Sequence, residues 1–417
     1  MANKADLEKY APSLALIISK LIENPEYSPE FLQNIEKQLP QAADHWSPCD
    51  SGVKNGVPDT STSGRYYDLA GPLADDLSHW KFLNIGKDEY LEKIEELLDN
   101  HRSIACFKIE KGEVTLLSNA LGAHFQGRIN MYSNLIKNIA NSFFRDASFI
   151  VPIDLDDLAK DCQIPIFSFQ KKSDSHIFLL PDIDFLQYSF YEDIQWHDTD
   201  SDFSNKLHKA IFVGSTTGLD SAGSGPVTNT LANVDSNPSQ RISAAKFFAN
   251  AQDVVFKLPS IVQCDAPATV EYLRSFDFCS GDRISMQEQY KNRYLLSLDG
   301  NGATCSRVAL ALRSNSVLMK YNSDFVLYYF YWLTPWKHYI PIKDNEIVES
   351  IIMQGRNNLD FHREIQKNAH DFYKKYLTKD AIYQYTAVAL NEYYGIFNRD
   401  EIYNRNIDLI NNSAPTS

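Results

Sequence analysis

Two segments rich in glycine and hydroxyl side chains each follow an apolar run, and their composition suits the binding of a phosphate. The first is KAIFVGSTTG, in which an expected strand leads into Gly214, Ser215 and Thr216. Small residues let backbone amides approach an anion, and hydroxyl groups can donate to its oxygens. The alternative is an ordinary polar loop, since the segment matches neither the Walker pattern nor the dinucleotide-binding fingerprint.

The second segment is RYLLSLDGNGATCSR, where a strand is expected to end in a glycine-rich turn and a helix to begin. Arg307 falls in the first turn of that helix, where a cation opposes the helix dipole unless an anion lies nearby. Because a guanidinium can hold a phosphate through two parallel hydrogen bonds, Arg307 is a candidate diphosphate ligand. The alternative is a surface arginine whose stem lies along the helix. The other candidates in this segment are Gly302, Ala303, Thr304 and Ser306.

The elements that would position these loops alternate between strand and helix after about residue 205. Such alternation predicts a parallel sheet covered on both faces, and parallel sheets bind ligands at the carboxyl ends of their strands. The expected strands are KAIFVG, 253–258, RYLLSLDG and SVLMKY, and the expected helices are 239–251 and 306–313.

The earlier part of the chain mixes helices with strands, and a polar, acidic link at 194–205 follows it. Since 417 residues are too many for one ordinary core, two domains of about 200 residues are expected. Residues 345–397 read as largely helical. The remaining expected elements are two helices within 6–39, a hairpin at Lys111-Gly112 between strands 103–109 and 114–118, a helix at 129–144, and strands at 148–153 and 164–169.

Composition and charge exclude several classes of protein. A net charge of −14 repels polyphosphate, so nucleic-acid binding is not expected. The six cysteines are scattered without a Cys-x-x-Cys pair, which argues against a zinc site and a dense disulfide framework. The N-terminus lacks the order of a signal peptide. These features favour a cytoplasmic protein, which could also lie against the inner membrane as a peripheral protein.

Taken in order, these segments resemble glycosyltransferase family 90, the group of capsule-associated xylosyltransferases, Rumi-type protein O-glucosyltransferases and bacterial lipopolysaccharide-modifying transferases. The most specific stretches are YKNRYLLSLDGNGATCSR, SVLMKYNSDF and LTPWKHYIPI, and the last carries a Pro-x-x-His-Tyr-x-Pro motif. HIFLLPDIDF and the segment from Phe203 to Gly214 add weaker matches. The resemblance spans about residues 165–370. It departs from the family at Val213, where arginine is frequent, and at Ile183, where an aromatic residue is frequent.

The resemblance implies an α/β fold of the GT-B type, in which two Rossmann-like domains face a cleft, with N-terminal helices and a C-terminal helical segment. Residues 1–200 would hold the N-terminal helices and the acceptor-side domain, and residues 201–380 would bind the nucleotide sugar. Residues 381–417 would pack back on the N-terminal domain.

The resemblance also implies an inverting transfer from a UDP-sugar, such as UDP-glucose or UDP-xylose, to a hydroxyl of a glycan or glycolipid acceptor. Without a secretion signal, a cell-envelope glycan such as lipopolysaccharide or capsule is the expected acceptor. No metal or other cofactor is expected, because enzymes of this type neutralise the leaving diphosphate with amides, hydroxyls and arginine.

Inversion requires one general base that deprotonates the acceptor hydroxyl. The resemblance assigns this role to Asp182, with Asp184 as the alternative. The competing role for Asp182 is a turn cap after Pro181.

For the diphosphate, the resemblance assigns Thr304, Ser306 and Arg307, with Ser215 and Thr216 from the first loop. Arg241 matches a family arginine that could reach the nucleotide, and its alternative is a salt bridge on a helix face. His338 is expected to order the backbone by hydrogen bonding rather than to act as an acid or a metal ligand.

A metal-dependent transferase of the other nucleotide-sugar fold is one alternative, because those enzymes hold a divalent cation with an Asp-x-Asp pair. In a chain this acidic such pairs also occur by chance. They are found here at Asp198-Thr199-Asp200, Asp200-Ser201-Asp202, Asp182-Ile183-Asp184 and Asp154-Leu155-Asp156.

A protein that binds glycans without catalysis is the other alternative. The 23 tyrosines and 24 phenylalanines could stack on sugars, although they would also fill two ordinary cores. Stabilisation by a nucleoside diphosphate would separate this alternative from an enzyme.

Overall fold

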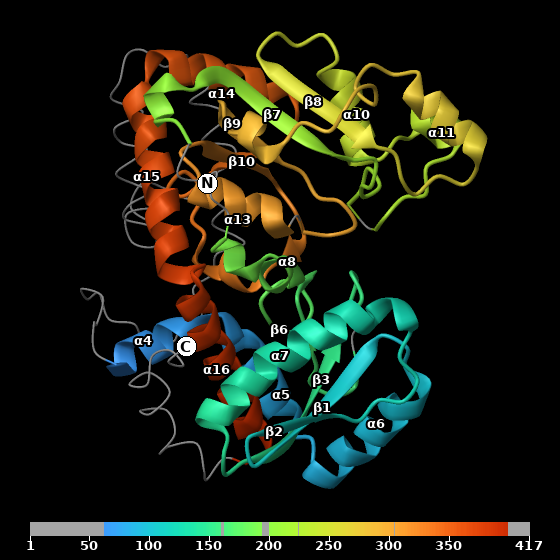
Figure 1. The fold of residues 1–417 in the computed structure, drawn as a ribbon, viewed down its shortest axis with the longest axis vertical. Coiled ribbons are helices and arrows are strands. Elements are labelled where there is room, and N and C mark those ends of the chain that lie inside the picture. The colour runs from blue at the N-terminus through green and yellow to red at the C-terminus, as the bar shows by residue number, and fades with distance from the viewer. Residues whose placement is uncertain (1–61, 160–161, 194–199, 224, 304, 399–417) are drawn as a thin grey trace.

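The computed structural model describes residues 62–159, 162–193, 200–223, 225–303 and 305–398. The helices expected within 6–39, the Asp198-Thr199 pair and Thr304 lie outside these ranges. The described chain folds into two α/β halves, one above the other in Figure 1, with helix α8 (Ile183–Gln187) at their junction. The expected α/β class is confirmed.

The C-terminal half is built on a sheet of five parallel strands in the order β12-β10-β9-β7-β8. Every residue of β9 and β10 is buried, as in sheets that helices cover on both faces. The predicted parallel sheet is therefore confirmed. Its strands are β7 (Leu207–Ser215), β8 (Val254–Ser260), β9 (Asn292–Ser297), β10 (Val317–Tyr321) and β12 (Ile340–Ile342).

Helices join and cover these strands, and the expected helices at 239–251 and 306–313 correspond to α10 and α13. The helices are α9 (Leu231–Ser236), α10 (Gln240–Phe247), α11 (Pro267–Arg274), α12 (Met286–Gln289), α13 (Cys305–Arg313), α14 (Glu346–Asn357) and α15 (Leu359–Tyr376). Strand β11 (Phe325–Val326) pairs with β5 (Lys171–Lys172), and the 3₁₀ helix η6 (Tyr328–Trp332) follows it.

The direction of strand addition reverses between β7 and β9. From β7 the chain passes to β8 on one side, and then returns so that β9 lies on the other side of β7, followed outward by β10 and β12. In open parallel sheets, ligands bind at the carboxyl ends of the strands at such a switch point. Both glycine-rich loops of the sequence follow these two strands.

The N-terminal half contains a mixed sheet in the order β2-β1-β3-β4-β6, in which β3, β4 and β6 are parallel. Lys111 and Gly112 join β1 to β2 with φ of 53° and 83°, so the predicted hairpin is confirmed. The strand expected at 164–169 is shorter, since only Phe167–Ser168 pairs as a strand. The elements are α4 (Thr62–Ala70), α5 (Ala74–Leu83), α6 (Lys87–Asn100), β1 (Ile104–Glu110), β2 (Glu113–Leu116), α7 (Gln126–Phe143), β3 (Ser148–Asp154), β4 (Phe167–Ser168) and β6 (Phe178–Leu179).

The helical segment expected at 345–397 divides into three helices, because two polar side chains start new ones. Asn358 accepts from the Phe361 amide to begin α15, and Thr378 accepts from the Ala381 amide to begin α16 (Lys379–Phe397). Helix α16 crosses to the N-terminal half and packs against α4, α5 and α7 (Figure 1).

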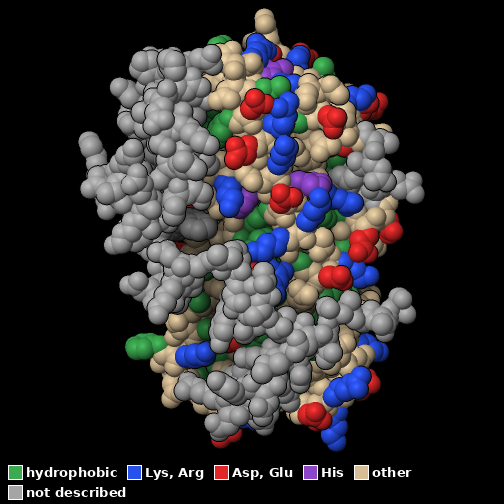
Figure 2. All heavy atoms as spheres, turned by 90° about the vertical axis from the view of Figure 1, so that its left-hand side faces the viewer, with side chains coloured by type: hydrophobic (Ala, Val, Ile, Leu, Met, Phe, Trp, Pro, Cys, Tyr) green, Lys and Arg blue, Asp and Glu red, His purple; other side chains and the backbone are tan. Residues whose placement is uncertain are grey.

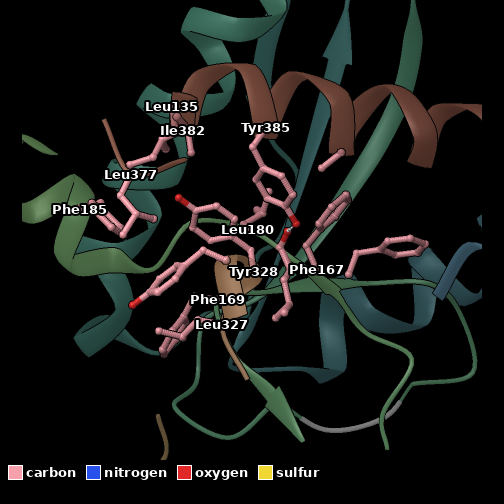
Figure 3. Packing of buried hydrophobic residues seen from close by; sticks show 14 of the residues in the cluster. Leu135, Phe167, Phe169, Leu180, Phe185, Leu327, Tyr328, Leu377, Ile382 and Tyr385 are labelled. Carbon is pink, nitrogen blue, oxygen red and sulfur yellow. Dashed lines mark hydrogen bonds between the residues drawn. The ribbon is translucent and has the colours of Figure 1, made fainter. Parts of the chain in front are cut away.

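One hydrophobic cluster joins the two halves. In Figure 3, Phe167 of β4, Tyr328 of η6 and Tyr385 of α16 converge on the same core. The Tyr328 and Tyr385 rings stack with centroids 4.4 Å apart. No helix within the described ranges is long and apolar enough to cross a bilayer.

Candidate active site

The loops at the carboxyl edges of the two sheets contact each other, and we call this contact the seam. On one side lie residues 155–157, 169–170 and 180–184, which follow β3, β4 and β6. On the other side lie residues 298–303 and 305–306, which follow β9. The contacts across it are the Ser306 amide donating to Asp184 Oδ2 at 3.0 Å, Asn301 Nδ2 lying 3.5 Å from Asp157 Oδ2, and Gly302 packing on the Gln170 amide.

Gly302 is required by this close approach. A Cβ at Gly302 would lie 2.5 to 2.8 Å from the side-chain amide atoms of Gln170, which is 3% exposed. The Gln170 amide is itself held because its Nε2 donates to the Asp157 carbonyl, and its buried Oε1 has no hydrogen-bond partner within the described chain. Sequence analysis did not select Gln170, since its contact with Gly302 joins segments far apart in the chain.

Arg241 belongs to α10, and its guanidinium ties together the carboxyl ends of β7 and β9. Its Nε and Nη2 donate to the Leu298 carbonyl at 3.2 and 3.0 Å, and its Nη1 donates to the Ser215 carbonyl at 3.3 Å and to Thr217 Oγ1 at 2.8 Å. The side chain is 6% exposed. Nearly all its donors therefore hold the two loops, and it does not form the salt bridge on a helix face that was the alternative.

Arg307 lies in the first turn of α13 and keeps more of its donors for another partner. Its Nη1 donates to Gln289 Oε1 at 3.1 Å and its Nη2 to the Val213 carbonyl. A guanidinium has five N–H donors, so three are not used by any described residue. The guanidinium lies over the Phe212 ring, 4.6 Å from its centroid.

The Arg241 guanidinium lies 5.2 Å from the centroid of the same ring, so two cations share Phe212. Within the described chain, no carboxylate forms an ion pair with either arginine. Burial lowers the pKa of Arg241 to about 9, with the charge of Arg307 as the second cause, and burial lowers the pKa of Arg307 to about 10. Since buried charges are normally paired, the arrangement suits an anion such as a diphosphate.

The two hydroxyls of the first loop differ in what they can offer. Ser215 is half-buried, and its Oγ lies 2.8 Å from Thr217 Oγ1 and accepts from Arg241 Nη1. Thr216 is fully buried, and its Oγ1 both donates to the Val262 carbonyl and accepts from the Val262 amide, each at 2.8 Å. Thr216 therefore anchors the loop, whereas Ser215 borders the arginine pair.

Glycines let the two loops approach these arginines. A Cβ at Gly214 would lie 2.8 Å from the Phe212 ring, and one at Gly300 would lie 2.9 Å from Arg241 Nη2. Ala303 is buried in the turn before α13. The structure thus brings together Gly214, Ser215, Arg241, Gly302, Ala303, Ser306 and Arg307 at the edge where the sequence placed them.

Asp182 follows β6 and caps α8, because its Oδ1 accepts from the Asp184 amide at 3.1 Å. Its side chain is 0% exposed, and its Oδ2 has no hydrogen-bond partner among the described residues. Burial, and next the charge of Asp184, raise the pKa of Asp182 well above its usual value. The cap role that sequence analysis kept open for Asp182 is therefore present in the structure.

Asp184 lies on α8 at the seam and is half-buried. Its Oδ2 accepts from the Ser306 amide, so its carboxylate occupies the N-terminus of α13. Burial raises the pKa of Asp184, and its contact with Ser306 opposes this shift.

A third carboxylate at the seam, Asp157, was not selected from the sequence. Its Oδ1 pairs with Arg128 Nη2 at 2.7 Å, its Oδ2 makes only the 3.5 Å approach to Asn301, and its side chain is 40% exposed. Asp157 thus has one anchored oxygen and one open oxygen beside the loop after β9. The signal in the sequence was its place just after the buried strand β3.

Asp200 and Asp154, two acidic residues of the Asp-x-Asp alternative, make contacts within the fold. Asp200 forms a buried ion pair with Lys206, and its Oδ2 accepts from the Asn315 amide at 2.7 Å. Asp154 Oδ1 accepts from the Asp156 amide at 3.0 Å. No group of three or more potential metal ligands occurs among the described residues.

His338 has the role that the sequence predicted. Its Nδ1 accepts from the Thr334 amide at 2.9 Å and so orders the turn before β12. Burial lowers the pKa of His338 to about 3, so the ring is neutral.

Comparison with known proteins finds two viral relatives and one family model that are similar to parts of this chain. The chain is 25% identical over 193 residues to the uncharacterized protein 035R of Invertebrate iridescent virus 3, covering 45% of this chain and 17% of that protein. It is 27% identical over 111 residues to the uncharacterized protein 179R of Invertebrate iridescent virus 6, covering 24% of this chain and 9% of that protein. The chain thus spans less than a fifth of either relative. The model of glycosyl transferase family 90 matches residues 278–414, less than half of the chain, and the match includes β9, the seam loop and α13. This part of the chain is therefore similar to the family that the sequence resembles.

Proposed function

We propose that the chain is an inverting glycosyltransferase that transfers a sugar from a UDP-sugar to a glycan hydroxyl, without a metal ion. The observation that carries the proposal is a pair of arginines, the buried Arg241 and the half-buried Arg307, that share Phe212 at the switch point with no carboxylate paired to them among the described residues. The loops that follow the parallel strands β3, β4 and β6 contact the loop that follows β9, and this contact suits the proposed GT-B arrangement, in which two domains face a cleft.

In this proposal Arg307 binds the diphosphate, because three of its donors are not used by described residues. Arg241 holds the loops after β7 and β9 in place and adds positive charge. Ser215 and the amides at the start of α13 complete the anion site. Charge that develops on the leaving UDP is then stabilised by groups already in position, which is the effect that a metal ion would otherwise supply.

The general base in this proposal is Asp157, since its open Oδ2 lies beside the loop after β9. Asp182 is fully buried and Asp184 is bound to α13, so both shape the seam. Binding of a diphosphate at α13 would compete with Asp184 for the Ser306 amide. Asp184 is therefore the second candidate for the base, once the donor has displaced it.

The acceptor in this proposal is a glycan hydroxyl, such as one on lipopolysaccharide or capsule. The proposed place of action is the cytoplasm, at or near the inner membrane, as the sequence suggested. The donor sugar is to be identified by screening UDP-glucose, UDP-xylose and UDP-galactose in a thermal-shift assay with EDTA present.

The test combines donor binding with transfer. UDP or one UDP-sugar should raise the melting temperature in EDTA, and Asp157→Asn should lower the transfer rate about 10²- to 10⁴-fold with donor binding retained. Asp156→Asn, an exposed neighbour, is the matched control. Active Asp157→Asn enzyme together with inactive Asp184→Asn or Asp182→Asn enzyme would move the base to that residue. No stabilisation by any nucleotide would refute the proposal.

A further inference from the structure

A second pocket lies outside the seam, between α15, η6 and the turn that His338 orders. Its volume is about 420 Å³, within the range of small-ligand sites. It is lined by five aromatic or imidazole rings, of Tyr331, Trp332, His338, Phe372 and Tyr376. None of the residues assigned above to the donor or the base lines it, so the proposed transfer does not account for it.

His338 presents a fixed hydrogen-bond donor to this pocket. Because Nδ1 accepts from the Thr334 amide, the single proton of the neutral ring must be on Nε2. The side chain is 8% exposed, and Nε2 has no hydrogen-bond partner within the described chain. This N–H is therefore available to an acceptor in the pocket.

Trp332 supplies a second donor of the same kind. Its Nε1 is buried without a hydrogen-bond partner among the described residues. The indole stacks on Tyr376 with centroids 4.4 Å apart and planes 13° apart, and Tyr331 beside it is 54% exposed. The pocket therefore combines flat aromatic faces with N–H donors, the two features that recognise the C–H faces and the hydroxyls of a sugar ring.

The pocket is lined by charged residues of both signs. Lys337, Lys375 and Asp371 line it, and Lys375 is also paired at 3.3 Å with Asp68, which Arg65 contacts as well. Figure 2, which views the molecule from the side of α14 and α15, shows basic and acidic side chains interspersed over the described surface.

We propose that this pocket binds a neutral sugar ring of an oligosaccharide, apart from the site at the seam. His338 Nε2 and Trp332 Nε1 donate to ring or hydroxyl oxygens, Asp371 and Asn368 accept from hydroxyls, and the exposed face of Tyr331 packs on the ring. This goes beyond the proposed function, because the bound sugar is held at a distance from the reacting groups and would retain a glycan chain on the protein.

The test is saturation-transfer NMR on the full chain with cellotriose, maltotriose and xylotriose, in the presence and absence of UDP. At least one trisaccharide should receive saturation, and saturating UDP should not remove the signal. His338→Asn keeps an acceptor for the Thr334 amide but removes the Nε2 donor, so it should weaken binding about five-fold with an unchanged melting temperature. Tyr331→Ala should weaken it to a similar extent.

Phe247→Ala is the matched control, because Phe247 is an aromatic residue of α10 that is 47% exposed and does not line the pocket. It should leave the sugar affinity unchanged. The inference is overturned if no trisaccharide receives saturation, if UDP displaces the sugar, or if His338→Asn and Tyr331→Ala bind as wild type. Failure of UDP to stabilise the protein would refute the proposed transfer alone and leave this result unaffected.

Discussion

Replacing Arg307 with methionine should weaken donor binding while leaving the fold nearly as stable as before. Methionine keeps an unbranched stem against Phe212 but has no donors. In the ligand-free protein, burial of Arg307 opposes folding, since a pKa lowered from 12.5 to about 10 corresponds to at most about 3 kcal/mol. The substitution relieves that cost. It also leaves the Val213 carbonyl and Gln289 Oε1 without their donor, at about 1–3 kcal/mol each.

These two effects oppose each other and are of similar size, so the melting temperature of the ligand-free protein should change by only a few degrees. UDP affinity should change much more. A hydrogen bond between charged groups contributes about 1.5–3 kcal/mol, which corresponds to a Kd about ten- to a hundred-fold weaker. At a UDP concentration 100 times the wild-type Kd, stabilisation by UDP should fall from about 2.7 to about 0.4 kcal/mol if the Kd rises a hundred-fold.

The assay is isothermal titration with UDP in EDTA, together with thermal melts. Arg293→Met is the control, because Arg293 is another arginine of this half but lies at the amino end of β9, where it donates to the carbonyls of Phe203, Ser204 and Lys206. It should destabilise the protein and leave the Kd for UDP unchanged. Wild-type affinity in Arg307→Met, or equal loss of affinity in both variants, would refute the assignment of the anion site.

Three further predictions concern the seam and the fold. Gly302→Ala should lower the free energy of unfolding by about 1–3 kcal/mol, because its Cβ would overlap Gln170, and it should raise the KM for the donor. Adding Gln170→Ala should restore stability in the double variant. Gly225→Ala is the control, because no atom lies within 4 Å of a Cβ at that position. Lys206→Met should lower the free energy of unfolding, measured with urea, by about 3–5 kcal/mol, because the buried Asp200 carboxylate loses its cation. Lys291→Met is the control: Lys291 belongs to an exposed ion pair, so its loss should change stability by less than about 0.5 kcal/mol. Burial raises the pKa of Asp76 from 3.8 to about 6, so between these pH values the folded state binds a proton that the unfolded state has lost. Protonated Asp76 therefore stabilises the folded state fully below pH 3.8. This stabilisation, about 3 kcal/mol, is lost as the pH rises through 6. Melts across this range should show a smaller decrease in Asp76→Asn, and an equal decrease would contradict the assignment to Asp76.

The sequence predicted the strands and loops at the carboxyl edge of the C-terminal sheet well because they are local features. Apolar runs ending in small and hydroxyl residues mark β7 and β9, and the alternation with helices implies that the carboxyl ends of these strands meet at one edge. The hairpin at Lys111-Gly112 was predicted for the same reason, since a two-residue turn depends on neighbours in the chain. By contrast, Asn358 and Thr378 were visible as helix caps within 345–397, and this local signal was not used.

The acidic side of the seam could not be predicted in the same way. Whether Asp157, Asp182 or Asp184 has an open oxygen depends on Arg128, on burial beneath α8 and on the start of α13, all of which are contacts between distant segments. Sequence position placed Asp182 correctly at the end of an apolar strand, but nothing in its neighbours shows that its carboxyl is fully buried.

The occupation of α13 by Asp184 has a consequence for how the seam responds to its donor. The Ser306 N–H donates to only one partner at a time, so a diphosphate bound to it at the helix N-terminus must displace the Asp184 carboxylate. Burial already raises the pKa of Asp184, and loss of the Ser306 contact would raise it further, because that contact favours the charged form.

Donor binding and protonation of Asp184 are therefore linked, and UDP should bind with net uptake of a proton near the pKa of this carboxyl. Titration of UDP in buffers of different ionisation enthalpy measures that uptake, and Asp184→Asn should abolish it. Proton uptake that persists in Asp184→Asn would assign the linkage to another group at the seam.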